Sequence, residues 1–469
     1  MSSSAPLPVR LFNTLTRSVE ALKPLSPPEV RVYCCGPTVY GFQHIGNFRT
    51  FLFEDLLVRT LRFAGYNVRH VMNITDVGHL VSDQDEGEDK MLLAARREKK
   101  KSEEIAEFYT SKFFEDWDRL HLLRPDIVCK ATEHIPEMID LIKRIESNGK
   151  TYVNGGNVYF DVEKCADYGK LAKLDLSAQK AGARVDVDAN KHSPFDFVLW
   201  FTKSKFENQE LQWDSPWGRG YPGWHIECSA MSIKYLGEQF DIHCGGVDHI
   251  PVHHTNEIAQ SEGATGHPWV PMWMHGEFLL FNNEKMSKSK GSTKLIGDLS
   301  DKGLDTMAFR YFCLSGHYRQ QISFSAEAIE GANNSYLRLK EQVLSLKDQA
   351  SPGPVTDRGT AHITKFAQAI TNDLNGPQAL AVLWEICGDK NLQAAEKLSV
   401  LDRVDAVLGF GLLALSRAEI PAEIQSFVSE REAARKSKNW ARSDELRGEI
   451  EKRGYSLKDS PQGAVVSKR

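Results

Sequence analysis

Several classes of protein are excluded by what this 469-residue sequence lacks. It has no apolar run approaching the roughly 18 residues of a membrane-spanning helix, and residues 1–10 contain no apolar segment of signal-peptide length. Eight cysteines are too few for a disulfide scaffold, and a net charge of −5 gives no overall reason to expect a nucleic-acid partner. The sequence therefore predicts a cytoplasmic, soluble protein with reduced thiols and no membrane contact.

What is present is an ordinary globular composition, 41% hydrophobic and 26% charged, with chain enough for about three domains. Residues 30–34 are typical of a short buried strand, apolar residues recur at helical spacing over 48–61, and residues 66–72 indicate a second strand. Gly65 stands where a helix C-cap glycine belongs. This βαβ pattern predicts a parallel sheet with a right-handed crossover.

The same α/β pattern returns near Gly223. It predicts a helix over 225–235, a strand over 240–243 ended by Gly245 and Gly246, a helix with Pro251 in its first turn, and a strand over 273–281. The charge block at 83–104 is typical of a solvated surface, and residues 90–215 have the pattern of an insertion between two halves of a sheet. Beyond Leu304 the pattern is mostly helical, with linkers at 351–354 and 416–421.

The first candidate site is His44-Ile45-Gly46-Asn47, where the first strand gives way to the long helix. A helix N-terminus offers free N–H groups and a partial positive charge to an anion, and Gly46 lets a base or a phosphate approach the backbone. His44 and Asn47 would place two hydrogen-bond donors on one side of the first turn. A helix-capping role explains the same residues equally well.

The second candidate site is the run Lys285-Met286-Ser287-Lys288-Ser289. Two lysines three residues apart suit a loop that closes on a polyphosphate and stabilises the charge developing on a leaving pyrophosphate. An exposed basic loop is the alternative. The occurrence of both motifs in one chain, each after a predicted strand, favours nucleotide chemistry.

A third set of residues has the chemistry of metal ligands. His253 and Glu257 are four residues apart and lie on one face of a predicted helix. Cys35 and Cys228 lie at the ends of core elements that would meet at the same edge of a parallel sheet, so the four side chains form a reasonable zinc shell. The spacing is not that of a zinc finger, and other candidates remain open. Cys34 is expected to point away from Cys35, His249 to lie outside the helix of His253, and His254 to be rotated about 100° from His253. The remaining candidates are His243 and Cys244.

Taken together, these residues closely resemble the cysteinyl-tRNA synthetases, a family of class I aminoacyl-tRNA synthetases. The matching stretches are 33–47, 73–76, 222–231, 240–260, 277–291 and 310–319. The resemblance implies an α/β fold, with a Rossmann-like catalytic domain split by an insertion and followed by a mainly α-helical C-terminal region. The implied division is 1–89 and 216–298 for the two catalytic halves, 90–215 for the connective insertion, 299–350 for a helical stem-contact region, 351–417 for a helical bundle, and 418–469 for a basic anticodon-binding domain.

The resemblance also implies the activity: a monomeric enzyme activates L-cysteine with ATP and transfers it to the 3′-terminal adenosine of tRNA(Cys). One Zn²⁺ ion per chain, held by Cys35, Cys228, His253 and Glu257, would bind the substrate thiolate, for which a serine hydroxyl is a poor substitute. Mg²⁺ is expected with ATP. Because zinc binding would distinguish cysteine from serine in a single step, the insertion need not be an editing domain.

Further roles follow from the resemblance residue by residue. The implied cysteine-binding residues are Thr75, Trp224, His243 and Asp248, with Asp248 near the substrate ammonium group. The implied ATP-binding residues are His44, Gly46, Asn47, Lys285 and Lys288, all but Gly46 also catalytic. No side chain needs to be a nucleophile, so catalysis would rest on positioning and on stabilising phosphate charge.

A tRNA partner is expected to show as local charge. Residues 431–469 contain eleven Lys or Arg and six Asp or Glu, a net charge of +5. The rest of the chain is acidic, so the net charge of the whole chain does not show this basic segment. An exposed Trp440 could stack on an unpaired base, whereas a solvated amphipathic helix with Trp440 in a small core is the alternative. The candidate tRNA-binding residues are Arg431, Arg435, Lys436, Lys438, Trp440 and Arg442.

The sequence departs from the family pattern at several positions. Asn47 stands where the family has His, Cys244 where Gly is common, and Thr255 where Glu is common. Asn still donates a hydrogen bond and cannot become cationic, so we expect function to survive. None of these departures removes a proposed metal ligand.

Other activities fit part of the pattern. A ligase that joins activated cysteine to an amino sugar would share the adenylation but has no use for a basic C-terminal domain. A zinc hydrolase that uses Glu257 or an open metal position to activate water has no use for a pyrophosphate clamp. A non-catalytic tRNA-binding paralogue is disfavoured by the intact ligand and lysine sets.

Replacing Lys288 with Ala is expected to slow cysteine-dependent ATP–pyrophosphate exchange by about 10²-fold, because a donor to developing phosphate charge is lost. The zinc content is expected to stay unchanged. Wild-type exchange rates in the Lys288→Ala variant would show that the clamp lies elsewhere.

Overall fold

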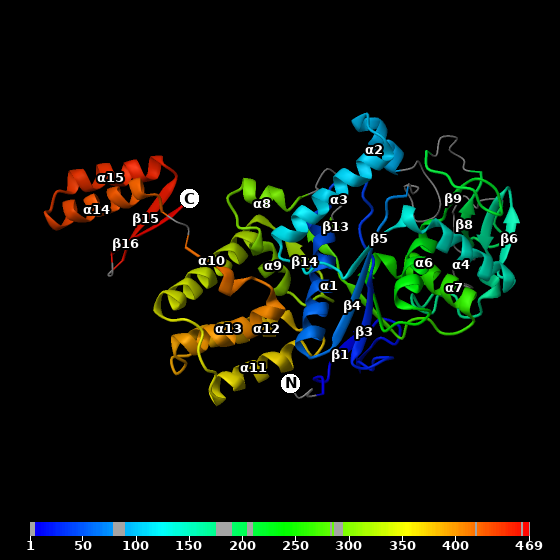
Figure 1. The fold of residues 1–469 in the computed structure, drawn as a ribbon, viewed down its shortest axis with the longest axis horizontal. Coiled ribbons are helices and arrows are strands. Elements are labelled where there is room, and N and C mark those ends of the chain that lie inside the picture. The colour runs from blue at the N-terminus through cyan, green and yellow to red at the C-terminus, as the bar shows by residue number, and fades with distance from the viewer. Residues whose placement is uncertain are drawn as a thin grey trace.

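The computed structural model describes residues 5–77, 90–174, 190–203, 210–281, 284–285, 294–417, 420–460 and 463–468 (Figure 1). Its centre is a five-stranded parallel sheet in the order β11-β10-β3-β4-β5. The strands are β3 (Glu29–Cys34), β4 (Asn67–Ile74), β5 (Ile127–Lys130), β10 (Ile242–Gly246) and β11 (Met272–Gly276).

The predicted βαβ unit is confirmed. Helix α1 (Ile45–Phe63) connects β3 to its parallel neighbour β4, and Gly65 has a φ of +96° just after the helix C-cap. The chain runs from β3 to β4 on one side and later places β10 on the other side of β3. This reversal of strand order opens a crevice at the carboxyl ends of β3 and β10, where α/β proteins bind ligands.

Three local predictions for the second half of the sheet were wrong. The strand predicted over 273–281 is two strands in different sheets, β11 and β12 (Leu279–Phe281), because the Glu277 amide donates to the Tyr318 carbonyl and the chain leaves the central sheet. β10 starts at Ile242 rather than at 240, and Gly245 lies within it, so that Gly246 alone ends the strand. Pro251 precedes α7 (His253–Thr265) instead of lying in its first turn.

Helices cover both faces of the central sheet (Figure 1). One face packs on α1 and α3 (Ser102–Arg119), and the other packs on α4 (Ile135–Ser147), α6 (Trp224–Leu236) and α7. Cys34 belongs to the first of these cores and Cys35 to the second, so the predicted alternation is confirmed.

The interval 90–215 contributes to two sheets. It begins with α2 (Lys90–Glu98) and α3 and then supplies β5 to the central sheet. It continues through α4 into the first three strands of an antiparallel sheet of order β6-β7-β8-β9, and β9 follows just beyond the interval. These strands are β6 (Thr151–Asn154), β7 (Asn157–Phe160), β8 (Phe197–Phe201) and β9 (Tyr221–Pro222).

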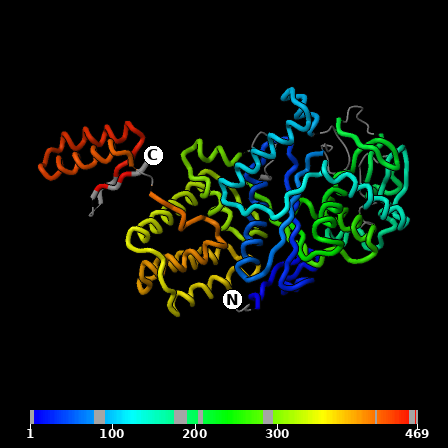
Figure 2. Tube along the Cα trace, viewed as in Figure 1, coloured from blue at the N-terminus to red at the C-terminus, as the bar shows by residue number. Residues whose placement is uncertain are grey.

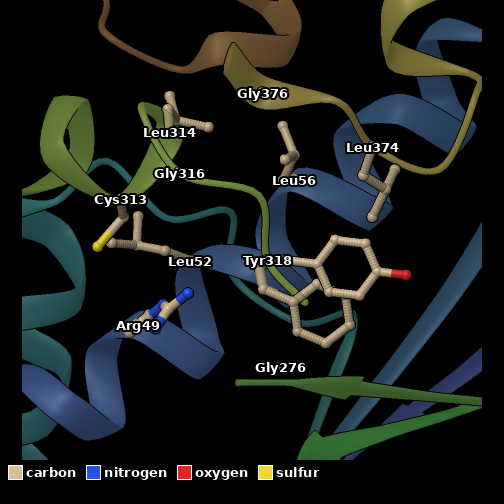
Figure 3. Close-up of a pocket in the computed structure, with 11 residues that line it drawn as sticks. Arg49, Leu52, Leu56, Gly276, Cys313, Leu314, Gly316, Tyr318, Leu374 and Gly376 are labelled. Atoms are coloured by element: carbon tan, nitrogen blue, oxygen red, sulfur yellow. The ribbon is translucent and has the colours of Figure 1, made fainter. Parts of the chain in front are cut away.

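The helical region after the sheet consists of α8 (Gly297–Asp301), α9 (Met307–Leu314), α10 (Ala326–Gln349), α11 (Asp357–Ile370), α12 (Gly376–Gly388) and α13 (Ala394–Leu408). Where it meets α1, a cavity of about 20 Å³ lies among Leu52, Leu56, Cys313 and Tyr318 (Figure 3). That volume holds about one water molecule, so this junction is closed packing rather than a ligand site.

The end of the chain forms a small unit with its own core (Figure 2). It consists of α14 (Ala422–Lys436), α15 (Trp440–Lys452) and the hairpin β15 (Tyr455–Ser460) and β16 (Gly463–Lys468), and its core contains Ile424, Ile450 and Leu457. Among all the described residues, no helix is both long and apolar enough to cross a membrane.

A buried ion pair joins the sheet domain to the helical region. Asp55 on α1 pairs with Arg310 on α9, and the two side chains are 0% and 1% exposed. Arg310 also donates to the carbonyls of Leu120 and Leu408, and Asp55 accepts from the Leu123 amide. Burial alone raises the pKa of Asp55, but Arg310 and Arg59 outweigh it, so the pKa is lowered.

Replacing Arg310 with Met is expected to lower the free energy of unfolding by about 3 kcal/mol, because the buried Asp55 carboxylate keeps Arg59 as its only cationic partner among the described residues. The control is Lys365→Ala, which breaks an exposed ion pair with Glu385 and is expected to change it by less than about 1 kcal/mol. Because folding lowers the pKa of Asp55, ionised Asp55 contributes to the free energy of unfolding at pH values above its unfolded pKa of about 3.9. This contribution is lost as the pH falls through the lower pKa of the folded state. Urea denaturation measures the free energy of unfolding of both variants. Equal losses in the two variants would contradict a stabilising role for the buried Asp55–Arg310 pair.

Candidate metal centre and active site

The carboxyl ends of three neighbouring strands supply the base of the site. Cys35 follows β3, Thr75 follows β4, and Asp248 lies in the short turn after β10. Gly36 fixes the chain between Cys35 and α1, because a Cβ there would lie 1.7 Å from the carbonyl oxygen of Asn73. The parallel sheet therefore brings residues that are far apart in sequence to one edge.

Two helices complete a compact cluster above this edge. Cys228 lies on α6, and His253 and Glu257 lie one turn apart on α7. The Cys35 Sγ atom is 3.9 Å from Cys228 Sγ and 3.9 Å from Glu257 Oε1, and His253 Nε2 is 2.9 Å from the same Glu257 oxygen. Donor atoms of all four buried residues lie within 4.8 Å of one another. Two thiols, one imidazole and one carboxylate are a donor set that fits zinc.

A second set of donors overlaps the first. It keeps Cys35 and Glu257 and replaces the other two ligands with His243 and His254. His243 Nε2 is 2.8 Å from Glu257 Oε2, and His254 Nε2 is 3.3 Å from Cys35 Sγ. The rotation between His253 and His254 thus does not remove His254 from the cluster, because Cys35 and Glu257 lie between the two imidazoles.

The pKa values of the clustered groups favour binding of a cation. Burial by itself raises the pKa of the Glu257 carboxyl, but the imidazoles of His243 and His253 outweigh burial and lower this pKa to about 2. The hydrogen bond from the Cys35 thiol lowers the pKa of Cys228, whereas burial raises the pKa of Cys35. Glu257 is therefore anionic, and binding of a metal would release protons from the thiols.

The four predicted cysteine-binding residues lie around this cluster. The Thr75 hydroxyl donates to Glu227 and accepts from Asn73. The Trp224 ring centroid lies 5.2 Å from that of His253, and His243 contacts Glu257 directly. Asp248 is exposed in the short turn that follows β10.

Several residues of the cluster were missed by the sequence analysis. His225 Nδ1 lies 2.8 Å from His253 Nδ1, and its position three residues before Cys228 on the same helix was a usable signal. A chain of contacts also runs from His254 Nδ1 to His275 Nε2 and from His275 Nδ1 to Thr14, each at 2.8 Å. Thr14 and His275 are 261 residues apart, and no sequence pattern connects them.

His44 and Asn47 form a reciprocal cap at the start of α1. The backbone N–H of Asn47 donates to His44 Nδ1 at 3.2 Å, and the backbone N–H of His44 donates to Asn47 Oδ1 at 3.1 Å. The capping interpretation is confirmed. The cap uses one atom of each side chain, so His44 Nε2 and Asn47 Nδ2 are not part of it. Gly46 packs closely on the cap, since a Cβ there would lie 2.9 Å from His44 Nδ1.

The lysine loop is described only in part. The backbone of Lys285 pairs with Leu280 in the short strand β13 (Glu284–Lys285). Lys288 lies outside the described residues. The roles of both lysines therefore remain predictions.

The candidate tRNA-binding residues divide into two groups. Arg435, Lys436, Lys438, Trp440 and Arg442 are exposed around the turn between α14 and α15, and Trp440 is 57% exposed. The Arg435 guanidinium lies 5.8 Å from the Trp440 ring centroid. Arg431 differs, because it is only 1% exposed on the inner side of α14. It therefore presents no surface to RNA in this conformation.

Replacing Cys228 with Ser is expected to remove bound zinc, because a hydroxyl is a poor substitute for a thiolate ligand. The matched control is Cys387→Ser, which changes a half-buried thiol on α12 and is expected to keep one zinc ion per chain. Metal analysis of the purified proteins gives the result. Equal zinc content in the two variants would favour the ligand set that contains His243 and His254.

Comparison with known proteins identifies the family. Residues 21–334 match the family model of the class I (C) tRNA synthetase catalytic domain, and residues 417–465 match that of the cysteinyl-tRNA ligase anticodon binding domain. The cysteine–tRNA ligase of Treponema denticola is 50% identical, covering 96% of this chain and 98% of that protein. Cysteine–tRNA ligase 1 of Burkholderia lata is 44% identical, covering 97% and 96% respectively.

A solved structure shows the same fold. Methionyl-tRNA synthetase of Mycobacterium tuberculosis, in complex with methionyl-adenylate, superposes with a TM-score of 0.55 at 16% identity and covers 82% of this chain and 91% of its own. Together with the metal-ligand cluster at the edge of a Rossmann-like parallel sheet, the comparisons show that this chain belongs to the cysteinyl-tRNA synthetase family of class I aminoacyl-tRNA synthetases.

Proposed function

We propose that this chain uses ATP to activate L-cysteine as cysteinyl-adenylate, with release of pyrophosphate, and then transfers the cysteinyl group to the 3′-terminal adenosine of tRNA(Cys). The observation that carries the proposal is the convergence of Cys35, Cys228, His253 and Glu257 at the carboxyl edge of the sheet. It is supported by the full-length similarity to proteins named cysteine–tRNA ligase.

The four clustered residues would hold one Zn²⁺ ion. We favour them over the overlapping set because they include two thiols, the softest donors of the cluster. When bound, zinc would supply a soft Lewis acid that takes the thiolate of cysteine as a ligand and discriminates against the hydroxyl of serine. Glu227 and His225 position this site, through hydrogen bonds to Thr75 and to the ring of His253 respectively.

The remainder of the cysteine would be bound by residues around the cluster. Asp248 at the open mouth offers a carboxylate to the substrate ammonium group. Thr75, Trp224 and His243 enclose the side chain between the ends of β4 and β10 and the start of α6. The substrate carboxylate then faces the N-terminus of α1, where ATP is expected.

ATP binding is assigned to the start of α1 and to the lysine loop. The cap formed by His44 and Asn47 holds the first turn of α1 in place, so its partial positive charge and Gly46 face the nucleotide. In the adenylation step a carboxylate oxygen of cysteine forms a bond to the α-phosphorus, and the bond from that phosphorus to pyrophosphate breaks. Lys285, Lys288 and a Mg²⁺ ion bound with ATP would stabilise the charge on the leaving pyrophosphate.

The tRNA would contact both the C-terminal unit, through its anticodon, and the catalytic domain, through its 3′ end. We assign residues 418–469 to anticodon binding, in line with the family match over 417–465. Arg435, Lys436, Lys438 and Arg442 would contact phosphates, and Trp440 would stack on a base. We further propose catalytic halves at 1–89 and 216–298 and an insertion at 90–215 that also adds β5 to the catalytic sheet. A stem-contact region at 299–350 and a helical bundle at 351–417 would follow, in a monomer that works in the cytoplasm.

The alternative activities are less well supported. An amino-sugar ligase would not use the C-terminal unit, which matches an anticodon binding domain. A zinc hydrolase would not use a pyrophosphate clamp or an anticodon binding domain, and residues 417–465 match such a domain.

Cysteine-dependent ATP–pyrophosphate exchange, followed by charging of a tRNA(Cys) transcript, tests the proposal. Zinc-loaded protein is expected to catalyse both steps and to reject serine at the first. No exchange would contradict adenylation, and exchange without charging would favour the amino-sugar ligase.

A further inference from the structure

Two exposed phenylalanines lie together beyond the N-terminal end of α1. Phe42, two residues before the capping His44, is 41% exposed, and Phe108 on α3 is 37% exposed. Their ring centroids are 6.3 Å apart, and Phe42 also meets Tyr109 edge-on at 5.1 Å. Both rings also contact Tyr109, which is buried, so one part of each ring packs on the core while the rest faces solvent.

Basic side chains surround the Phe108 ring. The Lys100 Nζ atom lies 4.6 Å from the Phe108 centroid, and the Lys112 Nζ atom lies 5.8 Å from it. Lys100 belongs to the run 96–101, in which every residue but Glu98 is Lys or Arg. Glu98 accepts hydrogen bonds from Arg97 and from the Tyr109 hydroxyl through Oε1, and its Oε2 lies 3.7 Å from Lys100 Nζ. A shallow hollow of about 480 Å³, lined by Lys100, Glu104, Glu107, Phe108 and Ser111, opens beside the ring.

The position of this surface relates it to the active site. α3 runs alongside the start of α1, with Phe113 against Phe48 and Phe51 and Trp117 against Phe51. Figure 1 shows α3 beside α1. Because Phe42 precedes the N-cap His44 by two residues, the exposed pair lies at the end of α1 where adenylate chemistry is proposed. Exposed aromatic rings flanked by lysines are the features with which proteins bind single-stranded nucleic acid.

We propose that Phe42, Phe108, Lys100 and Lys112, here called the aromatic platform, bind the single-stranded 3′ end of the tRNA. An unpaired base stacks on Phe108, and the two ammonium groups beside the ring contact the adjacent phosphates. In doing so Lys100 and Lys112 exchange their carboxylate partners, Glu98 and Glu115, for phosphate oxygens. Glu104 and Glu107, the two exposed carboxylates of the hollow, oppose the phosphates and limit the affinity. This inference rests on the proposed function, because it assigns a contact of the same tRNA substrate.

Phe108→Ala is the central test, with two reactions measured on the same protein. Pyrophosphate exchange without tRNA is expected to stay at the wild-type rate. The kcat/KM for charging full-length tRNA(Cys) is expected to fall by about 5- to 100-fold, which corresponds to the loss of one stacked base. Phe108→Tyr keeps an aromatic ring and is expected to restore charging. The control is Val153→Ala, which removes an apolar side chain that is 58% exposed on β6, and it is expected to charge normally.

Binding to shortened tRNA identifies which part of the tRNA is bound. Phe108→Ala and wild type are expected to bind equally a transcript that lacks its last four nucleotides, and to differ on the full-length transcript. Lys100→Ala and Lys112→Ala are expected to lower the salt dependence of full-length binding by about 0.7 each, and Glu107→Gln to tighten binding.

The outcomes separate this proposal from the proposed function. Wild-type charging by Phe108→Ala, or an equal loss of binding to both transcripts, would overturn the aromatic platform while leaving the enzyme assignment intact. Absence of pyrophosphate exchange in the wild-type protein would instead overturn the assignment on which the platform rests.

Discussion

The parallel pairing of β3 between β10 and β4 is the constraint on which the site depends. It aligns the carboxyl ends of three strands, so that Cys35, Thr75 and the turn containing Asp248 lie at one edge although they are separated by up to 213 positions. The two-residue period of a strand then directs Cys34 into the core under α1 and Cys35 into the core under α6 and α7. A slip of one residue in β3 would turn the Cys35 thiol to the opposite face of the sheet, away from the cluster.

Glu257 organises the cluster electrostatically. Its carboxylate is fully buried, and a buried charge is tolerated only with partners. Those partners are His243 and His253 on its two oxygens, with the Cys35 thiol nearby. In turn, His225 holds His253, and the chain through His275 to Thr14 holds His254. The polar interior is thus connected to α6, β11 and the N-terminal segment, which fixes the cluster in a geometry suited to a small cation.

Sequence reasoning predicted those parts of the fold in which one local pattern dominates. The helix over 45–63 followed from apolar spacing, and Gly65 followed from the need for a positive φ after the helix. Gly245 was misread as a strand end, but it is a glycine because a Cβ would lie within 2.7 Å of the rings of His249 and His254. The place of His254 in the cluster and the burial of Arg431 depend on packing between segments distant in sequence, which no local pattern encodes. The four favoured metal ligands were predicted because family resemblance supplied the long-range pairing that spacing alone left open.

The central claim is that the Cys35–Cys228 pair holds a zinc ion that takes the substrate thiolate as a further ligand. X-ray absorption at the zinc edge tests this most directly, because sulfur neighbours at about 2.3 Å are distinguished from nitrogen and oxygen neighbours at about 2.0–2.1 Å. The account predicts two sulfur neighbours in the protein alone, three after addition of cysteine, and two after addition of serine. A sulfur count that does not change with cysteine would contradict selection by thiolate binding, and a single sulfur in the protein alone would contradict the ligand set.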